Sequence, residues 1–446
     1  MKYDTLNCKG RAILYDMGAG FTHRGNHNHP PNPDLVEERA FHRQVLNDCR
    51  EQKWVSYRQI LDNQRSNRRY SRRVRARMTL PRLRSSMRRA RLETYPEIPQ
   101  TLEELSAALL DVNNAHIIQT EGDDFIYAGS VTARDGSHHV IFMSEEQKWI
   151  LGEAEVLHAD GTFKSRPATP RSSQLFCIVT TWETHVVPLC WVLMERRTIS
   201  AYRAVFQFLK NQTAINPRKI ITDFEYPQQR AWQIEFPRAS IQGCLYHLCS
   251  AFIKKCKNLR LVRYMRHFPD IKKVLMKAVA ISLLPSQYFE RALQIIKGDI
   301  RRRNAVVYYL MRGFFNYVND EWIANNRRRG WMCFFNKADR TNNACESHNR
   351  MLHNKVGAHR PNVWQFIEAL KVLENNAILD VEAISGEGVE VSRARRWTSV
   401  VMDARLQRLS RNLRRTIFRN RDYAIRSFLN RASHINHRVV NNLLPE

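Results

Sequence analysis

Three acidic residues lie far apart along this chain of 446 residues, each inside a short distinctive pattern. Asp160 lies in His158-Ala-Asp-Gly-Thr-Phe163, Asp223 in Ile221-Thr-Asp-Phe-Glu225, and Glu346 follows Arg340-Thr-Asn-Asn343. Phosphodiester cleavage needs an activated nucleophile and a stabilised leaving oxygen, and two divalent ions can serve both needs. Mg²⁺ takes oxygen ligands, typically one or two carboxylates and the substrate phosphate. We therefore expect Asp160, Asp223 and Glu346 to be catalytic residues that bind two Mg²⁺ or Mn²⁺ ions.

A single acid at a strand end is more often an exposed surface residue than a ligand. Three acids in apolar or motif-like surroundings, within a chain this basic, favour a shared site over incidental placement. Lys and Arg number 71 against 43 Asp and Glu, a formal charge of +28. Such a charge indicates a polyanionic partner, and double-stranded DNA is the first expectation.

Compartment and membrane contact follow from what the sequence lacks. The first residues, 1–8, carry no apolar signal segment, and no apolar run approaches the roughly 20 residues of a spanning helix, so no membrane contact is expected. The nine cysteines form an odd count without a secretion signal, which favours reduced thiols. We expect a nuclear protein.

The segment 65–92 holds twelve arginines and no acid. It repels itself unless phosphates neutralise it, which favours DNA contact or nuclear import over a solvated helix face or a linker. The preceding residues 34–64 have helical apolar spacing, so a helical basic N-terminal arm is predicted. The arginines expected to contact DNA are Arg68, Arg69, Arg72, Arg73, Arg75, Arg77, Arg88 and Arg89.

An α/β core follows the arm. Strands are expected at 125–128, 139–143, 156–163, 175–182, 185–193, 219–223 and 239–244, with a two-residue turn at 183–184 and a helix over 202–209. This order is that of an RNase H-like mixed sheet, in which a crossover helix makes the strand ending at Asp223 parallel to the strand of Asp160. Residues 251–338 then have helical periodicity throughout and predict an all-helical insertion before the helix of Glu346.

Five patterns carry a family resemblance: Asp160-Gly-Thr-Phe163, Leu189–Met194 after Pro188, Thr222-Asp-Phe-Glu225, Gly243-Cys-Leu-Tyr-His247, and Arg340-Thr-Asn-Asn343 leading to Glu346. On these, residues 100–375 resemble a Mutator-like (MULE) transposase of the DDE class. The resemblance implies an RNase H-like core with a helical insertion before the last acid. It also implies DNA transposition, in which water hydrolyses the transposon ends and the freed 3′-hydroxyls attack target DNA. Terminal repeats, target DNA and a homo-oligomer in the DNA complex would be the partners.

Two further groups of residues could bind zinc. Cys244 and His247 form the C-x-x-H pair of the family pattern, for which DNA contact or bracing of the core is favoured over a metal. Cys8, His27 and His29 resemble the second half of a FLYWCH zinc finger. A closed Zn²⁺ site needs four ligands, so zinc is expected there only if the finger is completed upstream; otherwise these are polar loop residues.

Beyond the core, Arg393–Arg438 carries thirteen arginines and an apolar stripe of Leu406, Leu409, Leu413 and Ile417. This predicts a basic helical C-terminal tail, either docked on the body or solvated. Trp322 and Trp331 near Arg327–Arg329 could stack on unpaired bases or belong to a core.

The predicted segments are a partial finger (1–31), the arm or linker (32–98), the first part of the RNase H-like core (99–250), the insertion (251–338), the end of the core (339–380) and the tail (381–446). Two rival functions remain open. One is a domesticated derivative that binds DNA and regulates transcription without catalysis. The other is a cellular nuclease on the same fold, which has less reason for the large insertion.

Overall fold

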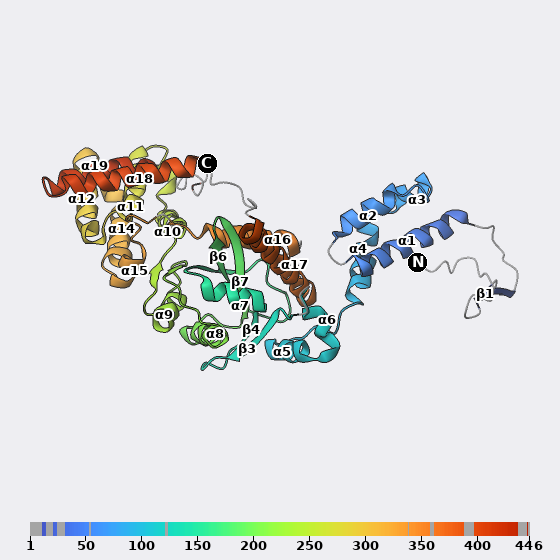
Figure 1. The fold of residues 1–446 in the computed structure, drawn as a ribbon. Coiled ribbons are helices and arrows are strands. Elements are labelled where there is room, and N and C mark those ends of the chain that lie inside the picture. The colour runs from blue at the N-terminus through green and yellow to red at the C-terminus, as the bar shows by residue number, and fades with distance from the viewer. Residues whose placement is uncertain are drawn as a thin grey trace. The chain divides into compact units, whose positions relative to one another are not determined.

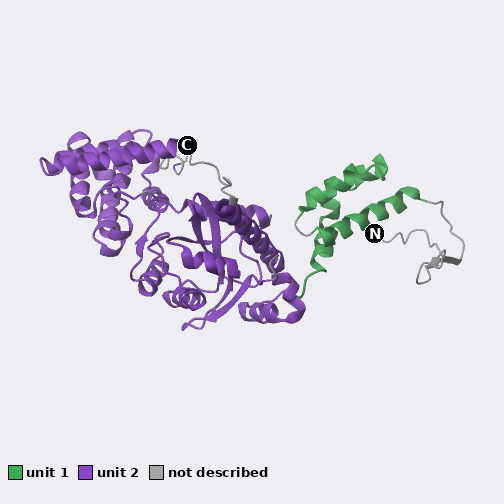
Figure 2. Ribbon diagram, in the orientation of Figure 1, with its two compact units in different colours: residues 1–97 green, residues 98–446 purple. Residues whose placement is uncertain are grey.

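The computed structural model describes residues 11–14, 21–24, 32–52, 55–120, 124–337, 339–356, 361–387, 397–435 and 444. The zinc ligands predicted at Cys8, His27 and His29 lie outside these residues. Two compact units make up the chain, residues 1–97 and 98–446 (Figure 2). The first contains an antiparallel pair, β1 (Arg11–Leu14) and β2 (Phe21–Arg24), and the helices described next.

The arginine-rich segment folds as part of a small helical bundle (Figure 1). Its helices are α1 (Pro33–Glu51), α2 (Tyr57–Ser66), α3 (Arg72–Arg77) and α4 (Leu80–Leu92). Serine side chains at 56 and 71 accept hydrogen bonds from the backbone three residues on, which starts α2 and α3. The shared apolar core includes Phe41, Val45, Ile60, Val74 and Met87.

Acids of α1 neutralise several of these arginines. Asp34 pairs with Arg73 at 3.2 Å and with Arg77 at 3.6 Å. Glu38 pairs with Arg77 at 3.3 Å and with Arg82 at 2.9 Å. The segment 65–92 contains no acid of its own, but α1 supplies acidic partners for its arginines. Phosphate is therefore not needed to hold the segment together.

A mixed sheet of seven strands organises the second unit. Its strands are β3 (Tyr127–Thr132), β4 (His138–Phe142), β5 (Val156–Thr162), β6 (Gln174–Trp182), β7 (His185–Met194), β8 (Lys219–Ile221) and β9 (Ser240–Gln242). The spatial order is β3-β4-β7-β6-β5-β8-β9. Neighbours pair antiparallel except for β5 with β8 and β8 with β9, which are parallel.

Helices cover both faces of this sheet, as the strand pairing dictates. Phe176 pairs with Val192 across β6 and β7, and its ring packs on Tyr202 and Phe206 of α8 (Ile199–Gln212). The next pair in the ladder is Cys177 with Trp191, whose side chains point to the opposite face. There α16 (Asn343–Val356) and α17 (Val363–Glu382) lie.

The remaining helices precede or complete the sheet: α5 (Leu102–Leu110), α6 (Ala115–Ile118), α7 (Glu145–Glu153) and α9 (Tyr226–Glu235). After β9 the chain enters a helical region containing α10 (Leu245–Asn258), α11 (Pro269–Ile281), α12 (Phe289–Arg303), α13 (Ala305–Leu310), α14 (Arg312–Tyr317) and α15 (Asn326–Trp331). The helices therefore begin at Leu245, six residues before the predicted start at 251, because α10 follows β9 directly.

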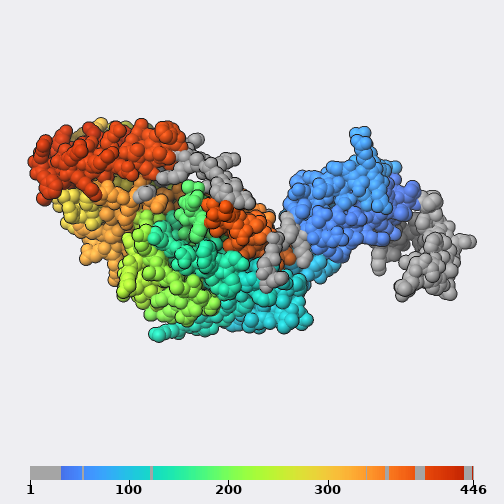
Figure 3. Space-filling view, in the orientation of Figure 1, coloured from blue at the N-terminus to red at the C-terminus, as the bar shows by residue number. Residues whose placement is uncertain are grey.

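The C-terminal segment folds as two helices, α18 (Trp397–Thr416) and α19 (Arg421–Ile435), which pack against each other and against α11. Leu406, Leu413 and Phe428 join the apolar cluster of the helical region. Figure 3 shows these red helices covering the yellow and orange ones. The alternative of a solvated tail is thus wrong. The tail is also two helices and not one: α18 ends at Thr416, and the Asn420 side chain accepts a hydrogen bond from Tyr423 N, 3.0 Å away, which starts α19. Among the described residues, every helix is too short or too polar to span a membrane.

Candidate active site

Asp160 and Asp223 are placed by neighbouring parallel strands. His158 of β5 pairs with Ile221 of β8, and each acid lies two residues beyond that pair. Asp160 is itself paired with Cys177, which points to the sheet face covered by α16. Both carboxylates are half-buried, and each accepts a backbone hydrogen bond: Asp160 Oδ1 from Gly161 N at 2.8 Å, and Asp223 Oδ1 from Glu225 N at 3.1 Å.

Glu346 comes from the first turn of α16, which packs on β5, β6 and β7. Ala344 and Cys345 are buried against Val179 of β6. One turn further, His348 accepts a hydrogen bond at Nε2 from Trp191 Nε1, 2.8 Å away. Burial lowers the pKa of His348 to about 4, so its imidazole is neutral and structural. These contacts fix the helix that carries the third acid.

Asp223 and Glu346 both lie within electrostatic range of Asp160. Burial raises the pKa of Asp160 to about 7, and the negative charges of Asp223, Glu346 and Glu225 add to the rise. Such a concentration of negative charge is unfavourable in a half-buried site unless a cation relieves it.

His247 opposes this effect at two of the acids. Burial raises the pKa of Asp223 and of Glu346, while the nearby His247 lowers both. Arg197 also lowers the pKa of Asp223 and lies 3.8 Å from Glu225. The histidine of the C-x-x-H pair therefore belongs to the electrostatic surroundings of the acids. Glu225 and Arg197 are two site residues that sequence analysis did not assign a role.

Among the residues that the structure describes, no group of three His, Cys, Asp or Glu side chains is placed to hold one metal ion. Charge interactions reach further than ligand distances, so this is compatible with the effect of Asp223 and Glu346 on the pKa of Asp160. One observation fits a role of Glu346 as a cation ligand. The Oε1 atom of Glu346 is buried and has no hydrogen-bond partner, which is costly for a carboxylate oxygen.

Cys244, the other residue of the C-x-x-H pair, is buried in the core and does not line the groove beside Asp223. Cys244 is buried at the start of α10, and its Sγ accepts a hydrogen bond from Asn342 N at 3.2 Å. Burial raises the pKa of this thiol to about 11, so it is protonated at neutral pH. The preceding residue must be glycine, since a Cβ at Gly243 would lie 2.2 Å from the Phe224 ring. Cys244 therefore braces the core.

A groove of about 590 Å³ opens beside Asp223. Its lining combines acids, two cations and aromatic rings: Arg197, Asp223, Phe224, Glu225, Pro227, His247, Ala251, Tyr317, Trp322 and Arg328. Trp322 and Trp331 are only 2 % and 5 % exposed, which makes them core residues rather than free stacking surfaces. The walls of the groove therefore carry both acidic and basic side chains beside Asp223.

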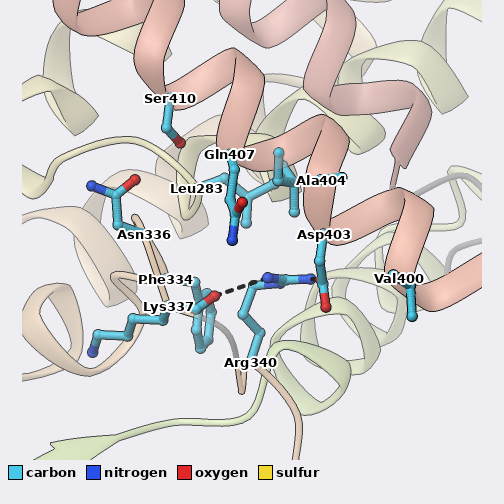
Figure 4. A pocket seen from close by; sticks show the side chains of 11 residues that line it. Leu283, Phe334, Asn336, Lys337, Arg340, Val400, Asp403, Ala404, Gln407 and Ser410 are labelled. Atoms are coloured by element: carbon cyan, nitrogen blue, oxygen red, sulfur yellow. Dashed lines mark hydrogen bonds and ion pairs between the residues drawn. The ribbon is translucent and has the colours of Figure 1, made fainter. Parts of the chain in front are cut away.

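A second cavity, of about 340 Å³, separates the segment before α16 from the tail helix α18 (Figure 4). At its edge Arg340 forms an ion pair with Asp403 of α18 and donates to the Lys337 carbonyl at 2.8 Å. Arg340 also accepts from Leu245 N at 2.7 Å through its own carbonyl. The family-like segment around residue 340 is thereby joined to α18 and to α10.

In the first unit, the predicted DNA-contact arginines divide into two groups. Arg73 and Arg77 are paired with Asp34, and Arg75 donates to the Arg65 carbonyl at 2.9 Å. The others are exposed, and none forms an ion pair with a described residue: Arg68, Arg69, Arg72, Arg88 and Arg89.

Residues 156–251 match the family model of the MULE transposase domain. The match begins at β5 and ends within α10, so it contains Asp160, Asp223, Cys244 and His247 but not Glu346. It supports a protein of the Mutator-like transposase type. A search of curated proteins found none that matches the chain.

Proposed function

We propose that this protein is a DNA transposase of the DDE class, which hydrolyses phosphodiesters at transposon ends and transfers the strands to target DNA. The observation that carries the proposal is the placement of three acids from separate elements around one site. Asp160 and Asp223 each lie two residues beyond one residue pair of adjacent parallel strands, and Glu346 lies on the helix packed against β5. The charges of Asp223 and Glu346 both raise the pKa of Asp160. The matched domain covers the first two acids, while Glu346 rests on its place in α16 and its effect on Asp160.

The strand order supports an RNase H-like core. The five strands β7-β6-β5-β8-β9 have one antiparallel meander and two parallel additions, with α8 as the crossover between β7 and β8. Since β5 and β8 are adjacent and parallel, side chains at their carboxyl ends meet at one sheet edge. Strands β3 and β4 extend the sheet beyond this five-stranded core.

Divalent ions fit the donor set of the site. Three carboxylates are hard oxygen ligands, and the Oε1 atom of Glu346 has no hydrogen-bond partner that would compete with a metal ion. We infer that Asp160, Asp223 and Glu346 hold two Mg²⁺ or Mn²⁺ ions. Such ions, when bound, activate the attacking hydroxyl and stabilise the leaving oxygen. Arg197 and Arg328 line the groove beside the acids and would bind the phosphate in exchange for their present partners, Glu225 and Glu321. His247 lowers the pKa of Asp223 and Glu346 and so offsets part of the negative charge.

DNA binding, a nuclear location and a homo-oligomer in the DNA complex complete the proposal. The charge of +28 and the exposed arginines of the first unit support DNA binding. The nuclear location and the homo-oligomer follow from the proposed reaction on DNA.

The test is nicking of supercoiled plasmid DNA by the purified full chain in Mg²⁺ or Mn²⁺. Asp223→Asn removes a metal ligand but no phosphate contact, so nicking should fall at least about 100-fold while DNA binding stays within about twofold. Glu153→Gln, an exposed acid of α7, is the matched control and should nick like the wild type. Undiminished nicking by Asp223→Asn would defeat the assignment. DNA binding without any nicking by the wild type would instead favour a domesticated, inactive derivative.

A further inference from the structure

Asn342 lies completely buried where three elements of the second unit meet. Its side-chain Nδ2 donates to the Ala159 carbonyl at 3.0 Å, and its Oδ1 lies 3.1 Å from His158 Nδ1. An amide oxygen can only accept, so His158 Nδ1 carries the hydrogen and donates this second bond. Both bonds hold β5 at the two residues before Asp160.

The backbone of Asn342 reaches the other two elements. Its N–H donates to Cys244 Sγ at the start of α10, 3.2 Å away, and its carbonyl accepts from Glu346 N at 3.1 Å. The β5–β8 ladder ends at His158 and Ile221, while β5 stays paired with β6 as far as Thr162. Beyond the end of the β8 pairing, the Asn342 side chain donates to the Ala159 carbonyl. One residue thus connects the strand of Asp160 to the first turn of the helix that carries Glu346.

We propose that Asn342 is a positioning residue that sets Glu346 against Asp160, with the Cys244 sulfur as its support. The inference rests on the proposed function and deepens it, because it assigns a role to the cysteine of the C-x-x-H pair and to the asparagine before α16. Asn342 touches neither substrate nor metal. It acts through the spacing of two carboxylates that must share cations, and outer residues of this kind typically change metal affinity or activity by 10- to 100-fold.

The test compares Mn²⁺ binding, followed by electron paramagnetic resonance, with the midpoint of thermal unfolding. In Asn342→Ala the Mn²⁺ dissociation constant should rise about tenfold or more. Cys244→Ala should weaken Mn²⁺ binding in the same direction, and Cys244→Ser, which retains an acceptor for Asn342 N–H, should restore most of it. Asn304→Ala is the control, because it removes the bond from Val307 N that caps α13 in the helical region. It should lower the unfolding temperature and leave Mn²⁺ binding unchanged.

Equal Mn²⁺ affinity in Asn342→Ala and wild type, or equal weakening in Cys244→Ser and Cys244→Ala, would overturn the inference. If Asn342→Ala does not fold, the two Cys244 variants decide alone. A wild type that binds Mn²⁺ without nicking DNA would refute the proposed function, and the titrations would still judge Asn342. If the wild type bound no Mn²⁺, both the proposed function and the proposed role of Asn342 would be refuted.

Discussion

Asp160 experiences four unfavourable influences on its charged form: burial and the charges of Asp223, Glu346 and Glu225. At a structural position such an arrangement lowers stability with no compensating gain. At a metal site it is what makes cation binding favourable, since the cation removes the repulsion that the fold maintains. The raised pKa of Asp160 can be tested on the protein without DNA.

The pH dependence of stability tests this property. In the native protein the pKa of Asp160 is about 7, whereas in the unfolded chain it is close to 3.8. Between these values the native state binds more protons than the unfolded state, so stability falls as pH rises from about 4 to about 7. Each tenfold change in proton affinity is worth about 1.4 kcal/mol, which makes the full effect roughly 4 kcal/mol at most.

Asp160→Asn keeps the acceptor for Gly161 N but carries no charge. Without divalent ions, its free energy of unfolding should exceed that of the wild type at pH 8, and the difference should shrink toward pH 5. Urea unfolding at pH 5, 6.5 and 8 measures this, with Glu153→Gln as the control. A difference that is the same at all three values of pH would show that Asp160 is not protonated in this range.

The sequence patterns led to the prediction of the three acids but not to the residues that hold them. Asp160 lies near the end of β5, Asp223 just after β8, and Glu346 in the first turn of α16, so each has recognisable neighbours in the sequence. Asn342 belongs to the Arg340–Asn343 pattern, but the sequence assigned it no role of its own. Its proposed role depends on contacts with Ala159 and Cys244, which are distant in sequence. Arg197 gave no signal, because nothing in its local sequence reveals that it faces Asp223.

At the scale of elements, the strands were predictable because their apolar runs and the turn at 183–184 are local features. All seven expected strands are present in the sheet. The tail was not predictable in the same way. An apolar stripe on a basic helix shows that one face is buried but not against what, and here α18 and α19 pack on the helical region next to the segment that leads to Glu346.

The ion pair between Arg340 and Asp403 makes the docking of α18 testable. Both side chains are only 16 % exposed, so Asp403→Ala leaves a guanidinium partly buried without its acid. The free energy of unfolding should fall by about 1–3 kcal/mol. The control is Asp422→Ala in α19, whose pair with Arg291 is exposed and should contribute little. Urea unfolding of both variants gives the comparison, and similar small losses would mean that Arg340 does not depend on α18.

At the scale of the whole molecule, the charge of +28 is not spread over equivalent arginines. Some already have partners within the protein. Arg73 and Arg77 pair with Asp34 at the surface, and Arg91 donates to the Val55 carbonyl at 2.7 Å beneath the bundle surface. These arginines are parts of the structure. Only those without an acidic partner in the described chain can release counterions from DNA without first breaking an ion pair.

Salt dependence separates the two groups. Each phosphate contact contributes about 0.9 to the slope of log affinity against log salt concentration. If Arg68, Arg69 and Arg72 each contact a phosphate, replacing all three by Gln should reduce the slope by about 2.7.

The control replaces three arginines that already have acidic partners in the second unit, Arg291, Arg302 and Arg303. It removes the same formal charge but should change the slope much less, because these guanidinium groups are neutralised by Asp422, Asp299 and Asp270. Fluorescence anisotropy of a duplex between 50 and 200 mM salt gives both slopes. Equal reductions would mean that net charge alone governs binding, and no reduction in the first variant would assign the first unit a role other than DNA contact.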